Sequence, residues 1–96
     1  MANMVVGVCS MKIFIYEANS LKSKRQVTKS IIERIKSRFN VSIAEVGDMD
    51  KWQVSEIAFC CVSNSRKHID STINNVIKFI ENDGRVDITE CNTEIS

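Results

Sequence analysis

The segment SLKSKRQVTKSIIERIKSRFN, residues 20–40, contains a helical repeat and more than half of the Lys and Arg residues of the chain. Apolar side chains recur in it every four residues, with one more beside them, at Val27, Ile31, Ile32, Ile35 and Phe39. This spacing predicts an amphipathic helix with one apolar stripe facing a core. Ser20 or Ser23 can cap its first turn, and Asn40 suits the left-handed residue that often follows a helix.

The charge of this segment distinguishes it from the rest of the chain. It carries seven Lys and Arg residues against one Glu, a net charge of +6, whereas the other 75 residues sum to −5 and the whole chain to +1. Such a separation favours a polyanionic partner more than the near-neutral total suggests. The plain alternative is a solvated helix face that binds nothing.

The candidate phosphate-binding residues are the cations at the start of this helix and along its solvent side, Lys22, Lys24, Arg25, Lys29 and Lys36. Three of them crowd the first turn, where the helix dipole disfavours positive charge by roughly a few tenths of a kcal/mol each. A bound anion would offset this cost. Lys24 and Arg38 fall within the apolar stripe at its two ends, so we expect their stems to lie on the core and their charges to stay in water.

The preceding segment, Met4–Tyr16, is rich in β-branched and aromatic residues and lacks helical spacing, so it predicts a strand. Its odd positions form an unbroken apolar face that should meet the core. Its even face is mixed but too apolar to lie wholly in water, and we expect a second subunit to cover it. The candidate dimer-interface residues on that face are Val6, Val8, Phe14 and Tyr16.

Two strands joined by a short turn are predicted after the first helix. They are Val41–Gly47 and Trp52–Ser63, and the polar turn Asp48–Lys51 separates them, which indicates an antiparallel hairpin. The centre of the second strand is apolar throughout. This composition is typical of a strand inside a sheet.

The remaining chain predicts a second helix and a last strand. The helix begins after a cap at Asn64 or Ser65 and ends before Gly84. Its core stripe consists of Ile69, Ile73, Val76, Ile77 and Ile80. The segment Arg85–Cys91 alternates as a strand does, and Asn92–Ser96 is expected to be a frayed tail.

The elements therefore follow the order strand, helix, strand, strand, helix, strand, within a single domain of residues 1–96 and an ordered core of about residues 4–91. Two right-handed crossover units of this kind place both helices on one face of a four-stranded antiparallel sheet. The predicted fold class is α+β, a ferredoxin-like plait of βαββαβ order. Its second sheet face is left open.

Composition argues against several classes of protein. No apolar run approaches the roughly 20 residues that span a bilayer, and no secretory signal precedes the first strand, so we expect a cytoplasmic protein without a membrane partner. The chain has no CxxC pair and a single His, so no metal or cofactor is expected. The cysteines are expected to pack in strands as small hydrophobic residues at Cys9, Cys60, Cys61 and Cys91.

No catalytic constellation stands out, and we expect a protein that is not an enzyme. His68 has no cysteine near it in sequence with which to form a nucleophilic pair. Acidic residues around the hairpin could bind a cation or share a proton, although such residues usually only solvate a turn; they are Glu45, Asp48, Asp50 and Glu56. Phe14 and Phe59 weakly resemble the stacking rings of RNA-recognition domains, but core or interface packing is the better interpretation.

Two motifs carry a resemblance to a family. Residues 20–25 read SLKSKR and residues 39–46 read FNVSIAEV. With VVGVC near the start and Trp52-Gln53 opening the third expected strand, the chain resembles the YlxP-like family of small bacterial proteins of unknown function over about residues 5–94. The resemblance implies a ferredoxin-like fold, a bacterial cytoplasmic setting, and gene neighbourhoods that often hold translation-initiation and ribosome-maturation factors. It implies no catalytic residue.

Two functions from different classes remain open. The first is a non-enzymatic protein that associates with RNA or the ribosome and holds phosphate with its basic first helix. The second is a homodimeric interaction module without a nucleic-acid ligand, which pairs through the open sheet face. The two could coexist, because they would use opposite faces of the plait.

Overall fold

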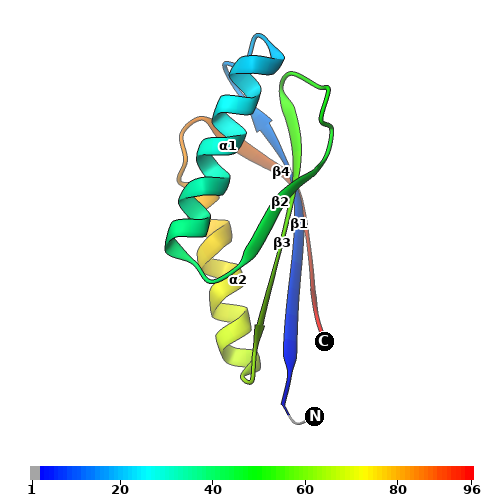
Figure 1. The fold of residues 1–96 in the computed structure, drawn as a ribbon, viewed down its shortest axis with the longest axis vertical. Coiled ribbons are helices and arrows are strands. Elements are labelled where there is room, and N and C mark those ends of the chain that lie inside the picture. Colours follow the sequence, from blue (N-terminus) through cyan, green and yellow to red (C-terminus); the bar gives the residue numbers. More distant parts are fainter. Residues whose placement is uncertain (1–2) are drawn as a thin grey trace.

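Both helices cover the same face of a four-stranded antiparallel sheet (Figure 1). The computed structural model describes residues 3–96, and its elements follow the predicted order. They are β1 (Val5–Ile15), α1 (Leu21–Arg38), β2 (Ser42–Gly47), β3 (Val54–Ser63), α2 (Arg66–Glu81) and β4 (Val86–Ile95). The strands lie in the order β2-β3-β1-β4, and every neighbouring pair is antiparallel. The predicted ferredoxin-like α+β plait is confirmed.

The core lies between the inner sheet face and the two helices. The odd-numbered residues of β1 from Gly7 to Ile15 are buried, as predicted, because side chains alternate between the two faces of a strand. The odd-numbered residues of β3 from Ser55 to Cys61 are buried in the same way. The helices contribute most of the remaining large side chains, Ile31, Ile35, Ile69, Ile73, Val76 and Ile80.

The two ends of α1 are held by different interactions. The Ser20 hydroxyl accepts a hydrogen bond from the Ser23 N–H at 3.1 Å, and the Ser23 hydroxyl accepts one from the Ser20 N–H at 3.2 Å. This capping box uses both of the predicted serines. The expectation for Asn40 is wrong, because the capping residue Phe39, directly after the helix, has an extended backbone and Asn40 is not left-handed. The Phe39 ring packs edge-to-face on Phe79 of α2, with centroids 6.0 Å apart, and so anchors this end of the helix.

The C-terminal segment belongs to the sheet. β4 continues beside β1 as far as Ile95, and the backbones of Val6 and Ser96 exchange hydrogen bonds of 3.0 and 2.9 Å. The expectation of a frayed tail from Asn92 onward is therefore wrong. β1 offers backbone groups along its whole length, and a polar segment gains strand hydrogen bonds there without needing an apolar side chain at every second position.

Gly7 lies where α2 crosses β1 closely. A Cβ added at this position would lie 2.6 Å from Ile69 Cγ2 and 2.8 Å from Ile73 Cδ1. We predict that Gly7→Ala lowers the free energy of unfolding by about 1–3 kcal/mol, because the two isoleucines and their helix must shift. Urea unfolding followed by circular dichroism measures the change.

Gly84→Ala is the matched control. Among residues 3–96, nothing lies within 4 Å of a Cβ added at Gly84, and the φ of Gly84 is not positive. The free energy of unfolding should stay unchanged or rise by up to about 1 kcal/mol, because alanine restricts the unfolded chain. Equal losses of stability in the two variants would contradict the close crossing at Gly7.

Candidate functional site

Charge is separated between the two layers of the fold. α1 and α2 carry ten Lys and Arg residues against three Asp and Glu, whereas the rest of the chain carries three against nine. Lys24 is buried, and the other nine helix cations are exposed. The sequence pointed to the first helix, and the structure adds Arg66, Lys67 and Lys78 of α2 to the same layer. We call these nine exposed cations the basic helix layer.

Four of the five predicted phosphate-binding residues are exposed on α1: Lys22, Arg25, Lys29 and Lys36. A shallow cavity of about 270 Å³ lies between α1 and the edge strand β2. Its walls are Arg25, Thr28, Lys29, Ile32 and Glu45. Two of the predicted cations therefore border a concave surface, and all four remain candidates for phosphate binding.

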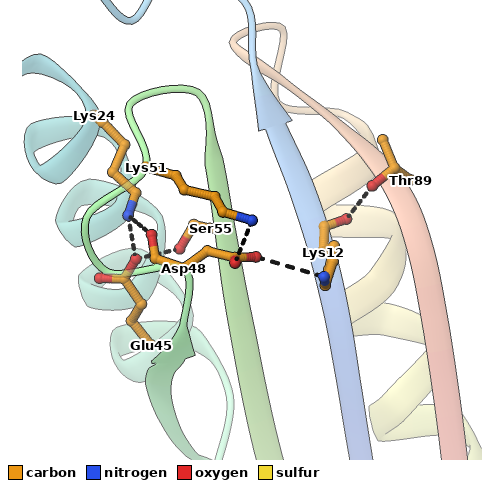
Figure 2. A network of polar contacts seen from close by, with 7 residues as sticks. All are labelled: Lys12, Lys24, Glu45, Asp48, Lys51, Ser55 and Thr89. Atoms are coloured by element: carbon orange, nitrogen blue, oxygen red, sulfur yellow. Dashed lines mark hydrogen bonds and ion pairs between the residues drawn. The ribbon is translucent and has the colours of Figure 1, made fainter. Parts of the chain in front are cut away.

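Lys24 does not belong to this surface. Its side chain is 0% exposed, and its ammonium donates hydrogen bonds of 2.7 Å to Glu45 Oε2 and 2.9 Å to the Asp48 carbonyl (Figure 2). The Ser55 hydroxyl donates to the same Glu45 oxygen at 2.6 Å. The prediction that Lys24 keeps its charge in water and binds phosphate is corrected. Its charge is used inside the fold, where it ties α1 to β2 and β3.

The burial of Lys24 follows from its position on the helix. It lies one turn before the buried Thr28, so its stem points toward the sheet. Glu45 lies two residues after the buried Ile43 and points to the same face of β2. A buried ammonium is stable only with such a partner. The sequence contained one signal for this buried ion pair, namely a cation within the apolar stripe of the first helix and an acid on the strand that follows.

The same polar network continues into the turn between β2 and β3. Asp48 has a left-handed backbone with φ of 59°, and its carboxylate lies 3.2 Å from Lys51 Nζ and 3.7 Å from Lys12 Nζ. The hydrogen bond from Lys51, with the added charge of Lys12, holds the pKa of Asp48 below its usual value. Glu45 and Asp48 thus form ion pairs with lysine side chains. Within residues 3–96, no group of three or more His, Cys, Asp or Glu is placed to hold a metal ion.

A second polar cluster fixes the other flank of α1. Arg85 donates to the two carboxylate oxygens of Asp83 at 2.9 and 2.7 Å, and to the Ser30 hydroxyl at 3.2 Å. The guanidinium holds the pKa of Asp83 below its usual value. Sequence reasoning missed this cluster, because it depends on α1 lying beside the turn after α2. Arg85 is therefore part of the scaffold and not of the basic helix layer.

The open face of the sheet carries the predicted dimer residues. Val8 and Tyr16 are exposed, and Val6 and Phe14 are half-buried. In the strand register Val6 stands beside Val62, whose side chain is 62% exposed. An apolar surface therefore crosses β1 and β3 on the face that the helices leave uncovered.

The aromatic rings do not form the stacking pair of RNA-recognition domains. Phe59 is 2% exposed and lies in the core on the helix side of the sheet. Phe14 is at an even position of β1 on the open face, where its ring contacts Tyr16 with centroids 5.7 Å apart. Because the two phenylalanines lie on opposite faces, they cannot stack on bases of one strand. Core packing of Phe59 is confirmed.

The cysteines divide into two kinds. Cys9 and Cys61 are buried, whereas Cys60 and Cys91 are exposed. The expectation that all four pack as small hydrophobic residues is therefore wrong for two of them. Cys60 lies on the open sheet face, and Cys91 lies on β4, the edge strand that pairs with β1.

Comparisons with known proteins place the chain in a family. A family described as "Protein of unknown function (DUF503)" matches residues 6–93. The chain belongs to this family. It is 37% identical over 90 residues to "Uncharacterized protein YlxP" of Bacillus subtilis (strain 168), a match that covers 94% of this chain and 98% of the relative. The resemblance to YlxP-like proteins is thereby confirmed.

A solved structure supports the fold alone. "De novo designed protein Foldit4" is similar to this chain with a TM-score of 0.54 and 15% sequence identity, covering 97% of this chain and 96% of the designed one. At that identity the likeness concerns architecture. Of the helices within residues 3–96, none is long and apolar enough to cross a membrane.

The ion pair also involves one residue of each motif on which the family resemblance rests. Lys24 lies in SLKSKR and Glu45 in FNVSIAEV, so the bond between them joins the two motifs in space. Ser20 of the first motif is the helix cap. The structural roles of these residues leave Lys22 and Arg25 as the exposed cations of the motif.

Lys24→Ala is expected to lower the free energy of unfolding by about 3–5 kcal/mol, because Glu45 is left largely buried without its counter-ion. Lys22→Ala is the matched control two residues earlier; Lys22 is exposed, and its removal should change the free energy by less than about 0.5 kcal/mol. Urea unfolding measures both variants. The effects of Lys24→Ala and Glu45→Ala should also combine to less than their sum, and strict additivity would contradict the pairing.

Proposed function

We propose that this is a non-enzymatic cytoplasmic protein that binds the phosphate backbone of structured RNA, free or within the ribosome, across the basic helix layer. The observation that carries the proposal is the separation of charge, with a net +7 on the two helices and −6 on the rest of the chain. RNA is favoured among polyanions because the family resemblance implies gene neighbourhoods with translation and ribosome-maturation factors.

The dimensions of the basic helix layer suit binding to a nucleic-acid backbone. α1 has 18 residues and is therefore about 27 Å long at 1.5 Å per residue. Arg25, Lys29 and Lys36 are separated by four and seven residues, so they follow one flank of the helix. A strand lying along that flank can meet several cations in succession.

Binding of this kind carries affinity without reading the base sequence. Interactions of Lys and Arg with phosphate oxygens position the nucleic acid and release its counter-ions, which makes the association constant fall steeply with salt. We therefore expect a dissociation constant of roughly 10⁻⁴ to 10⁻⁶ M for structured RNA at physiological salt. Dimerisation would raise the apparent affinity for a long RNA through two linked binding surfaces.

The variant Lys22→Glu/Arg25→Glu/Lys29→Glu is expected to bind structured RNA at least about tenfold more weakly at low salt, because attraction to phosphate becomes repulsion. The dependence of log K on log salt should become shallower by about 0.7–0.9 for each phosphate that the variant no longer neutralises. Filter binding over a salt series measures both quantities. Equal binding by the variant and the unmodified protein would overturn the proposal.

A pair of single substitutions distinguishes binding at the basic helix layer from an effect of the total charge of the protein. Arg25→Glu and Lys51→Glu change the net charge equally, but Lys51 lies in the turn between β2 and β3, outside the helix layer, and its side chain is 60% exposed. Of the two variants, only Arg25→Glu should weaken RNA binding.

Co-sedimentation of the protein with ribosomal subunits, and its release when the salt concentration is raised, tests whether the ribosome is the natural source of the RNA.

The second candidate is a homodimer that pairs through the open sheet face. The specific observation is the exposure of two apolar β-branched side chains on that face, 44% for Val8 and 62% for Val62. A two-fold axis would bury the same surface on both subunits. Such a dimer would leave both basic helix layers directed outward, which makes it compatible with the first function.

Sedimentation velocity at micromolar concentration should show a dimer for the unmodified protein and a monomer for Val8→Asp/Val62→Asp, because two buried carboxylates would oppose pairing. Met49→Asp is the control: Met49 is also exposed, at 53%, but lies in the turn outside the sheet face. A monomeric unmodified protein would remove this candidate.

A further inference from the structure

Two thiols far apart in sequence meet at the edge of the sheet. Cys9 Sγ and Cys91 Sγ lie 3.7 Å apart, although 82 residues separate them along the chain. Cys9 is in the central strand β1 and is 0% exposed, whereas Cys91 is exposed on β4. In the register Cys9 stands opposite Thr93 and Cys91 opposite Met11. The cysteines are thus diagonal neighbours on the helix side of the sheet.

We propose that Cys9 and Cys91 form a dithiol site that is reversibly oxidised to a disulfide by hydrogen peroxide or an organic hydroperoxide. Cys91 reacts with the oxidant, and Cys9 resolves the product. The site is independent of RNA binding and of the open sheet face, because it lies on the opposite side of the sheet from that face and on an element outside the basic helix layer.

The reaction has two balanced steps. The Cys91 thiolate attacks a peroxide oxygen; the O–O bond breaks, Cys91 becomes a sulfenic acid, and the leaving hydroxide takes up a proton as water. Cys9 sulfur then attacks the Cys91 sulfur, the S–O bond breaks, and the Cys9 proton leaves with the hydroxyl group as a second water. Two thiols and one hydrogen peroxide become one disulfide and two waters.

Solvent exposure determines which cysteine reacts with the oxidant and which one resolves the product. An oxidant in water reaches the exposed Cys91 and does not reach Cys9 directly. Burial also raises the pKa of Cys9 to about 11, so its sulfur stays protonated at neutral pH. Cys9 is therefore protected from solvent oxidants until its neighbour carries a good leaving group at van der Waals distance.

The geometry favours a disulfide that is easily reduced. The sulfurs must approach from 3.7 Å to about 2.05 Å, and diagonal strand positions are wider than an unstrained disulfide prefers. In the described part of the chain β4 pairs with β1 only, so its other edge is free and the strand can shift. A strained bond has a higher reduction potential, and small thiols should reverse it.

Intact-protein and peptide mass spectrometry tests the proposal on the full folded chain. The protein is treated with a stoichiometric amount of hydrogen peroxide, unfolded in alkylating reagent, and digested. Before alkylation we expect an intact monomer lighter by two hydrogen atoms, and after digestion one cross-linked peptide pair containing Cys9 and Cys91. Dithiothreitol should restore both thiols, and amide hydrogen exchange along the C-terminal half of β4 should slow in the oxidised form.

Two exposed cysteines provide matched variants. Cys91→Ser should abolish the cross-link and leave Cys9 reduced, whereas Cys60→Ser should leave the cross-link intact, because Cys60 lies on the other face of the sheet. Oxidation of Cys91 to sulfinic acid with Cys9 still reduced would overturn the proposal. So would cross-links that form only between chains, or oxidation confined to Cys60.

Discussion

The hydrogen-bonded ion pair between the Lys24 ammonium and the Glu45 carboxylate fixes the position of α1 against the sheet. It is a charged pair with one partner fully buried, and Ser55 and the Asp48 carbonyl complete its hydrogen bonding. Through it the first turn of α1 is held against β2, β3 and the turn between them (Figure 2). A buried ion pair adds little stability over an apolar substitute, but removing one partner is costly. The pair therefore specifies how α1 sits more than it strengthens the fold.

This ion pair also decides which charges the molecule can offer to a partner. With Lys24 inside and Arg85 bound to Asp83, most of the exposed positive charge lies on the two helices, while most acids lie on the sheet and its connections. The open face is the third distinct surface, apolar across β1 and β3. A single small domain thus has a basic side, which the proposed binding of a polyanion would use, and an apolar strip across β1 and β3 on the opposite face, which the proposed dimer would use.

Sequence reasoning succeeded where one element's own pattern carried the information. The four-residue repeat from Val27 to Phe39 predicted the buried side of α1, and alternation along β1 predicted its inner face. Sequence reasoning failed where the environment of a residue depends on another element that packs beside it. Lys24 was expected to be a surface cation because its partner lies 21 residues later. Residues 92–96 were expected to be a tail because their pairing depends on β1, and Cys91 is exposed because β4 is an edge strand.

The order and type of the six elements, the central position of β3, the core stripes of both helices and the concentration of positive charge on α1 were determined by the sequence itself, because each depends on local spacing and composition. Three features depend on packing: Lys24 is an internal counter-ion, α2 shares the basic side, and Cys9 meets Cys91. These outcomes depend on which faces the crossovers bring together. Side chains distant in the chain acquire their partners, and hence their chemistry, only when the sheet and helices have packed.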